Sequence, residues 1–250
     1  MIKKMVFAVA IAAITCPALI AQEADIAPAE RKKIESVIQD YLMENPEIVM
    51  MAIRELQRRQ TLAEMLPSVN LYRDYLEKDP AAPVLGNPQG DVTIVEFFDY
   101  RCGYCRRHFP EVMRLVEGDG NIRYLPKQFP ILDSPQGEPL SMLSAKAAIA
   151  AQKQGKFAEF HKAMMSSKTQ ITEDAIYRIA ESVGLDVAML KSDMADKLVE
   201  KRITNTLSIG QDIGFSGTPG YIIGDDIVTG AEGYDRLKEA VDRARKGKVE

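Results

Sequence analysis

The sequence has few of the side chains that bind metals, with three cysteines and two histidines among its 250 residues. A structural zinc site needs four ligands, usually supplied as two pairs of cysteine or histidine. Beyond Cys102 and Cys105, the only candidates are Cys16, His108 and His161, which are not spaced as a second pair. The sequence therefore argues against zinc, and we expect neither a metal nor a cofactor.

Clusters of positive charge are also missing. Lys and Arg together number 32 against 36 Asp and Glu, and the basic residues are scattered rather than gathered with interleaved aromatic residues. We therefore expect no nucleic-acid partner. The chain has no repeat of solenoid length and no low-complexity tract, and its 46% hydrophobic content is typical of a globular protein with one substantial core.

Residues 1–21 have the pattern of a secretory signal peptide. Lys3 and Lys4 precede a short apolar run over residues 5–14, and Ala21 supplies a small residue before a cut. This run is too short to span a bilayer comfortably, although a retained membrane anchor is the alternative. Cleavage near Ala21 would remove Cys16 and leave two cysteines in an exported, periplasmic protein. In an oxidising compartment such a lone pair is expected to be catalytic.

Those two cysteines form the motif Cys102-Gly103-Tyr104-Cys105. An apolar, β-branched and aromatic run over residues 92–98 predicts a buried strand before the motif, and residues 106–117 predict a helix after it. Cys102 then lies at a helix N-terminus, where free N–H groups and the helix dipole favour a thiolate. Cys105 lies one turn further on, where it can resolve a mixed disulfide. A purely structural disulfide is disfavoured, because so short a loop removes little chain entropy.

Residues 27–78 carry apolar side chains at helical spacing. Asn45-Pro46 interrupts the pattern, and Pro46 suits the first turn of a second helix. Pro67 argues against one straight helix after it. Two interpretations stay open: a helix packed on the main domain, or an oligomerisation arm. The second follows if the apolar positions lack a partner within a complete domain, and these positions are Ile34, Ile38, Leu62, Val69 and Leu76.

The Pro-rich stretch over residues 79–83 predicts a domain boundary. After it, the patterns predict an edge strand at 84–85, strands at 92–98 and 121–128, helices at 140–152, 157–165, 172–183 and 188–213, a hairpin at 221–223 and 227–228, and a closing helix at 234–245.

This order of elements, with the motif at 95–105 and Thr218-Pro219 near the hairpin, resembles the DsbA-like exported thiol:disulfide oxidoreductases over residues 83–246. The resemblance implies an α/β thioredoxin fold with a helical domain inserted at about 136–213. We thus expect a signal peptide (1–21), an N-terminal helical arm (22–79) and a DsbA-like domain (80–250).

The resemblance also implies roles for particular residues. Cys102 corresponds to the attacking thiol and Cys105 to the resolving one. Glu96 corresponds to the buried acid that relays a proton to or from Cys105, with Lys127 as its partner charge. A surface glutamate on an edge strand is the alternative for Glu96.

Thr218-Pro219 falls where the family has its cis-proline loop, which binds the substrate chain. Arg101, Arg106 and Arg107 surround the motif with positive charge that is expected to favour the thiolate, although solvent-exposed arginines are the simpler interpretation.

Gly103-Tyr104 stands where the strongest oxidants of the family have Pro-His, and it resembles the periplasmic disulfide isomerases instead. The arm resembles that of DsbA-like proteins linked to copper tolerance, some of which oligomerise. These likenesses imply disulfide isomerisation or oxidation on exported cysteine-containing proteins, a membrane redox partner and a homo-oligomer formed through the arm. A copper(I) carrier using both thiolates is the alternative, but the Thr218-Pro219 loop favours the enzyme.

Overall fold

A computed structural model describes residues 27–247, so the expected signal peptide, Cys16 and Ala21 lie outside the described residues. The chain divides into two compact units after Ile53. The first contains α1 (Pro28–Glu44) and the beginning of α2 (Pro46–Lys78). No residue of α1 is buried. The prediction that a second helix begins at Pro46 is confirmed. The helix also continues through Pro67, against expectation.

The second unit is built on a five-stranded sheet in the order β1-β3-β2-β4-β5. β2 and β3 run parallel, while every other pair is antiparallel. The strands are β1 (Leu85–Gly86), β2 (Val92–Phe98), β3 (Ile122–Gln128), β4 (Gly220–Ile223) and β5 (Asp226–Thr229). The central strand β2 is buried because both faces of the sheet are covered, which is consistent with its run of β-branched and aromatic residues.

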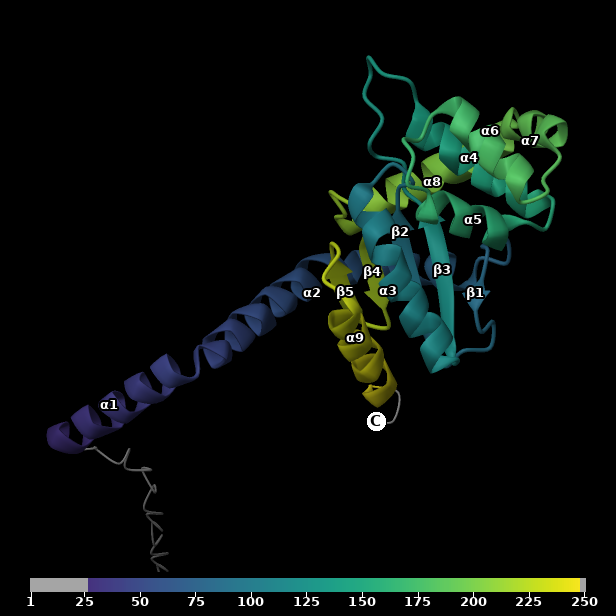
Figure 1. The fold of residues 1–250 in the computed structure, drawn as a ribbon. Coiled ribbons are helices and arrows are strands. Elements are labelled where there is room, and N and C mark those ends of the chain that lie inside the picture. The colour runs from purple at the N-terminus through teal and green to yellow at the C-terminus, as the bar shows by residue number, and fades with distance from the viewer. Residues whose placement is uncertain (1–26, 248–250) are drawn as a thin grey trace, which may run out of the picture. The chain divides into compact units, whose positions relative to one another are not determined.

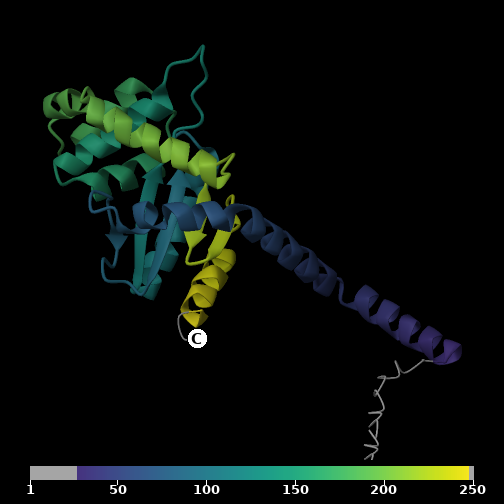
Figure 2. The same ribbon diagram turned by 180° about the vertical axis from the view of Figure 1, so that it is seen from behind.

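Helices cover both faces of the sheet (Figures 1 and 2). On one face, α3 (Gly103–Asp119) and α9 (Tyr234–Lys246) pack against alternate side chains such as Ile94 and Tyr221. On the other, α8 (Lys197–Ile213) and the C-terminal half of α2 pack against Val95 and Phe97. The alternation along β2 therefore sends neighbouring residues into two separate cores.

The remaining helices gather together over one end of the sheet (Figure 1). They are α4 (Leu140–Lys153), α5 (Phe157–Ser166), α6 (Glu173–Ser182) and α7 (Val187–Met194). The single helix expected over 188–213 is in fact α7 and α8, because the Asp196 side chain accepts a hydrogen bond from the Leu198 amide and begins a new helix. The predicted thioredoxin fold with a helical insertion is confirmed.

The C-terminal half of α2 corrects one expectation about the arm. Val69 and Leu76 were expected to lack a partner, but they are buried among Phe97, Leu125 and other core residues, and Leu62 packs against the same cluster. That expectation is wrong because the apolar face of the C-terminal half of α2 packs against the sheet and forms part of the core. The segment that leaves apolar side chains exposed is shorter, and it includes Val37, Ile38 and Tyr41.

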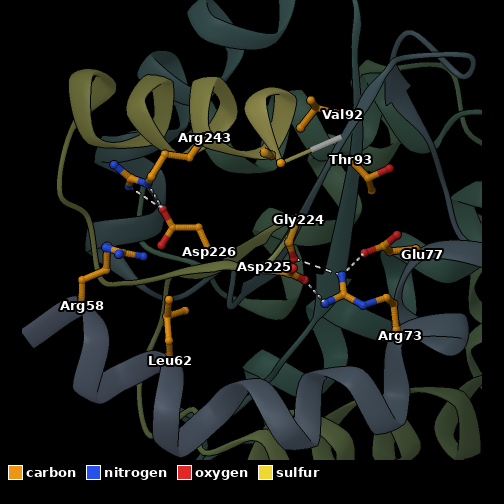
Figure 3. Close-up of a pocket in the computed structure, with 12 residues that line it drawn as sticks. Arg58, Leu62, Arg73, Glu77, Val92, Thr93, Gly224, Asp225, Asp226 and Arg243 are labelled. Atoms are coloured by element: carbon orange, nitrogen blue, oxygen red, sulfur yellow. Dashed lines mark hydrogen bonds and ion pairs between the residues drawn. The ribbon is translucent and has the colours of Figure 1, made fainter. Parts of the chain in front are cut away.

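A cavity of about 420 Å³ lies between α2, the β4–β5 turn and α9 (Figure 3). Across it, Arg73 of α2 donates hydrogen bonds to the Gly224 carbonyl and to Asp225. Arg243 of α9 pairs with the buried Asp226. These ion pairs fasten α2 and α9 to the hairpin, and none of the predicted site residues lines the cavity.

Candidate active site

Cys102 is the N-cap residue of α3, directly after β2 and a short turn. Its sulfur accepts a hydrogen bond from the Cys105 amide at 3.5 Å. The pKa of the Cys102 thiol falls to about 5, first because of hydrogen bonding with the Cys105 side chain and then because of bonds at Thr218 and the helix amides, against the opposing effect of burial. Cys102 is thus held as a thiolate at neutral pH. Its exposed fraction is only 6%, less than expected for an attacking thiol.

The loop before β4 faces this sulfur. The Thr218–Pro219 peptide bond is cis, as the resemblance implied. The Thr218 carbonyl oxygen lies 3.3 Å from Cys102 Sγ and accepts a hydrogen bond from it when Cys102 is protonated. The tertiary structure therefore brings together a motif and a loop that are 116 residues apart in the sequence.

Cys105 lies inside the first turn of α3 and is fully buried. Burial, more than any other effect, raises the pKa of its thiol well above the usual range, and the charge on Glu96 acts in the same direction. The two cysteines thus have opposite character, a thiolate at the surface end and a thiol inside. This is the asymmetry that a nucleophile and a resolving cysteine need.

Glu96 is buried on β2, and the alternative of a surface glutamate is wrong. Tyr124 on β3 donates a hydrogen bond to its Oε2 atom, and Tyr221 on β4 donates one to Oε1 at 3.1 Å. Burial raises the pKa of Glu96 to about 7, although both hydroxyls favour its charged form. An acid with a pKa near neutrality can both accept and release a proton at physiological pH.

Lys127 is not the partner of Glu96, which corrects the expectation. In the parallel register Glu96 lies opposite Pro126, while Lys127 lies opposite Phe97. Because side chains alternate between faces, Lys127 projects from the other side of the sheet. There its Nζ atom bonds to the Tyr75 carbonyl and lies 3.7 Å from Asp79.

The residues between and around the cysteines have other partners. Gly103 is the first residue of α3, and Tyr104 is 64% exposed with the Arg107 guanidinium 4.6 Å above its ring. Arg101 pairs with Asp133. Arg106 donates to the carbonyls at positions 167 and 169. Arg101 and Arg106 are therefore engaged with other groups, and the pKa of Cys102 is lowered by hydrogen bonds.

The tyrosines that bond to Glu96 and the histidine behind them were missed from the sequence. His108 Nδ1 lies 2.7 Å from the Tyr221 hydroxyl and is buried. Its position three residues after Cys105 places it on the same buried face of the helix, which is the one available signal. Tyr124 and Tyr221 carry no such signal, because their meeting with Glu96 depends on strand register.

Within residues 27–247, no group of three or more His, Cys, Asp or Glu side chains comes together as metal ligands do. Among the helices of the same residues, none combines the length and the hydrophobicity that a membrane span requires. A dithiol at a helix N-terminus, facing a cis-proline loop and backed by a buried acid, defines the class of thiol:disulfide oxidoreductases of thioredoxin fold.

Comparison with known proteins agrees with this class. The thioredoxin family model matches residues 78–243, and the model of the copper resistance protein ScsC N-terminal domain matches residues 30–61. A thioredoxin-like oxidoreductase from Silicibacter pomeroyi DSS-3 is 46% identical over 70% of this chain and 98% of its own, with a TM-score of 0.65.

A linker-deleted Proteus mirabilis ScsC is 26% identical over 90% of this chain and 99% of its own, with a TM-score of 0.65. The thiol-disulfide exchange protein alpha-DsbA2 from Wolbachia pipientis is 29% identical over 75% of this chain and 97% of its own, also with a TM-score of 0.65. Among curated sequences, the match to a Na⁺/H⁺ antiporter of Salinispora tropica is 28% identical and covers 63% of this chain. This chain spans only about a quarter (24%) of that antiporter's length.

The chain therefore belongs to the thioredoxin family, as a DsbA-like thiol:disulfide oxidoreductase with an ScsC-type N-terminal segment.

Proposed function

We propose that this protein exchanges disulfides with exported, cysteine-containing proteins through Cys102 and Cys105. The observation that carries the proposal is the pairing of a low-pKa thiol at the N-cap of α3 with a buried, high-pKa thiol behind it. The Thr218–Pro219 loop lies against the first sulfur, where an extended client chain would be held. A periplasmic location fits this chemistry.

In the reducing direction, the Cys102 thiolate attacks a client disulfide. One client sulfur leaves as a thiolate and takes a proton from solvent, while the other stays bonded to Cys102. Cys105 then transfers its proton to ionised Glu96 and attacks Cys102 Sγ. The second client thiolate departs, and the Cys102–Cys105 disulfide forms. Oxidation of a client is the same sequence in reverse.

Trapping tests the order of attack. Cys105→Ser is expected to accumulate mixed disulfides with exported proteins, because the attached client cannot be released by the second thiol. Cys102→Ser is expected to trap none, since Cys105 is fully buried. Equal trapping by both variants, or trapping by Cys102→Ser alone, would overturn the assignment.

We further propose that residues 27–53 drive self-association, so that several dithiols act on one client and favour isomerisation. This proposal is supported by the exposed apolar side chains on α1 and the beginning of α2, namely Val37, Ile38, Tyr41, Met43, Met50 and Met51. Clustering would raise the effective concentration of thiolates around a client during reshuffling. The Gly103-Tyr104 pair is consistent with a milder oxidant, and an isomerase of this kind needs a membrane redox partner that keeps it reduced.

Deleting residues 1–53 tests this second proposal and keeps the part of α2 that the core needs. The shortened protein is expected to be a monomer by light scattering, to reduce insulin normally and to lose most isomerase activity on scrambled ribonuclease. Full isomerase activity in a monomeric protein would separate the segment from catalysis. A copper(I) carrier predicts instead stoichiometric copper binding by the reduced protein without exchange on either substrate.

A further inference from the structure

A chain of buried hydrogen bonds connects Glu96 to the backbone on the far side of α3. The Tyr221 hydroxyl lies 3.1 Å from Glu96 Oε1 and 2.7 Å from His108 Nδ1. The Gly233 amide nitrogen lies 3.0 Å from His108 Nε2 and donates to it. These four groups come from β2, β4, α3 and the loop before α9, and the three side chains are buried.

The donor and the acceptor of each hydrogen bond in this series follow from the Gly233 amide. A backbone N–H can only donate, so His108 Nε2 must accept from Gly233. Burial lowers the pKa of His108, so the ring is neutral at physiological pH and carries its single proton on Nδ1. Nδ1 then donates to the Tyr221 oxygen, which leaves the Tyr221 hydrogen for Glu96 Oε1.

We propose that His108 is a positioning residue for thiol exchange: locked in one tautomer by the Gly233 amide, it holds the Tyr221 hydroxyl as a permanent donor to Glu96 and so favours the carboxylate that receives the proton of Cys105. The inference rests on the proposed function, because it concerns the acid that serves the resolving cysteine. Without the histidine donor, the Tyr221 hydroxyl can rotate and accept a hydrogen bond from the protonated carboxyl of Glu96, which favours the neutral acid.

The other groups around Glu96 and His108 are compatible with this role. Tyr124 donates to Glu96 Oε2, and charge on Cys102 opposes ionisation of Glu96. Charge on Glu96 in turn raises the pKa of Cys105. On the other side, Glu111 Oε2 lies 3.7 Å from His108 Nε2 and favours the charged ring, but burial is the larger effect.

The test measures the ionisation of Glu96 directly, by carbon-13 NMR titration of its carboxyl group in the oxidised full-length chain. Two substitutions form a matched pair. The asparagine of His108→Asn keeps a side-chain N–H near the position of Nδ1. The longer glutamine of His108→Gln reaches toward Gly233 and leaves no donor at the position of Nδ1 beside Tyr221. We expect the Glu96 midpoint to stay near the natural value in His108→Asn and to rise by about one pH unit in His108→Gln.

Tyr221→Phe removes the hydroxyl that connects His108 to Glu96. It should raise the midpoint by a similar amount, and adding His108→Gln to it should change nothing further, since the connecting hydroxyl is already gone. The pH profile of thiol exchange should move with the midpoint. Equal midpoints in the Asn and Gln variants, or additive shifts in the double variant, would overturn the proposal.

A measurement on the natural protein decides the matter if a variant fails to fold. Nitrogen-15 NMR of the His108 ring reports which nitrogen carries the proton, and a proton on Nε2 refutes the proposal. Neither NMR experiment requires enzymatic activity. Failure of the proposed function would instead appear as absence of mixed disulfides in Cys105→Ser, with the Glu96 titration unaffected.

Discussion

Replacing Glu96 with glutamine removes an ionisable group that the fold holds at a high pKa. Glu96 is 1% exposed, and burial raises its pKa from an ordinary 4.5 to about 7. Because the folded-state pKa lies above the unfolded one, Glu96 lowers the free energy of unfolding at every pH at which the unfolded chain ionises this side chain. Its contribution is neutral below about pH 4.5 and becomes unfavourable as the pH rises to 7 and beyond.

The size of the effect follows from the shift. A difference of roughly 2.5 pKa units corresponds to about 3 kcal/mol of folding free energy that is lost by pH 8. Glutamine avoids this penalty because it is never charged. It offers one acceptor oxygen where the carboxylate accepts from both Tyr124 and Tyr221, so part of that hydrogen bonding, about 1 kcal/mol, is lost. The net expected gain in stability is about 2 kcal/mol at pH 8.

Urea unfolding of the reduced protein, in which both cysteines are free thiols, at pH 4.5 and pH 8 measures this gain. Glu96→Gln should unfold at higher urea than the natural protein at pH 8 and at the same or slightly lower urea at pH 4.5. The exposed Glu117→Gln is the matched control, and it should change neither midpoint by a comparable amount. A stability difference that is the same at both pH values would refute the reasoning, because it would show that the pKa of Glu96 is the same in the folded and the unfolded protein. Thiol exchange should be slower in Glu96→Gln, since the proton acceptor for Cys105 is gone.

Two further predictions address the nucleophile and the helix that covers the sheet. The rate of Cys102 alkylation in the reduced protein should be nearly constant from pH 8 to pH 6 and half-maximal near pH 5, because its pKa is about 5; a half-maximal point above pH 7 would contradict the stabilisation of the thiolate by hydrogen bonds. Leu76→Ala should lower the free energy of unfolding by about 2–5 kcal/mol, because this side chain is 1% exposed in the core. Leu71→Ala, on the exposed side of the same helix at 76%, should change it by less than about 0.5 kcal/mol. Similar losses from both substitutions would argue against the docking of α2.

The sequence by itself determined the elements and the chemistry that depend on neighbouring residues. The strand before the motif, the helix after it and the position of Cys102 between them follow from a local pattern, because strand periodicity and helix N-termini are set over a few residues. The burial of Glu96 is also favoured locally, since its immediate neighbours in β2, Val95 and Phe97, are apolar. The break at Asn45-Pro46 is local in the same way.

Only the tertiary structure decided which distant residues meet. The alignment of β3 beside β2 places Lys127 on the face opposite Glu96, and no local pattern specifies that register. Docking of α2 buries Val69 and Leu76, whose spacing alone fits a free arm equally well. The tyrosines that bond to Glu96 and the histidine behind them come from three other elements. Their meeting depends on long-range packing, and that packing sets the proton chemistry of the dithiol.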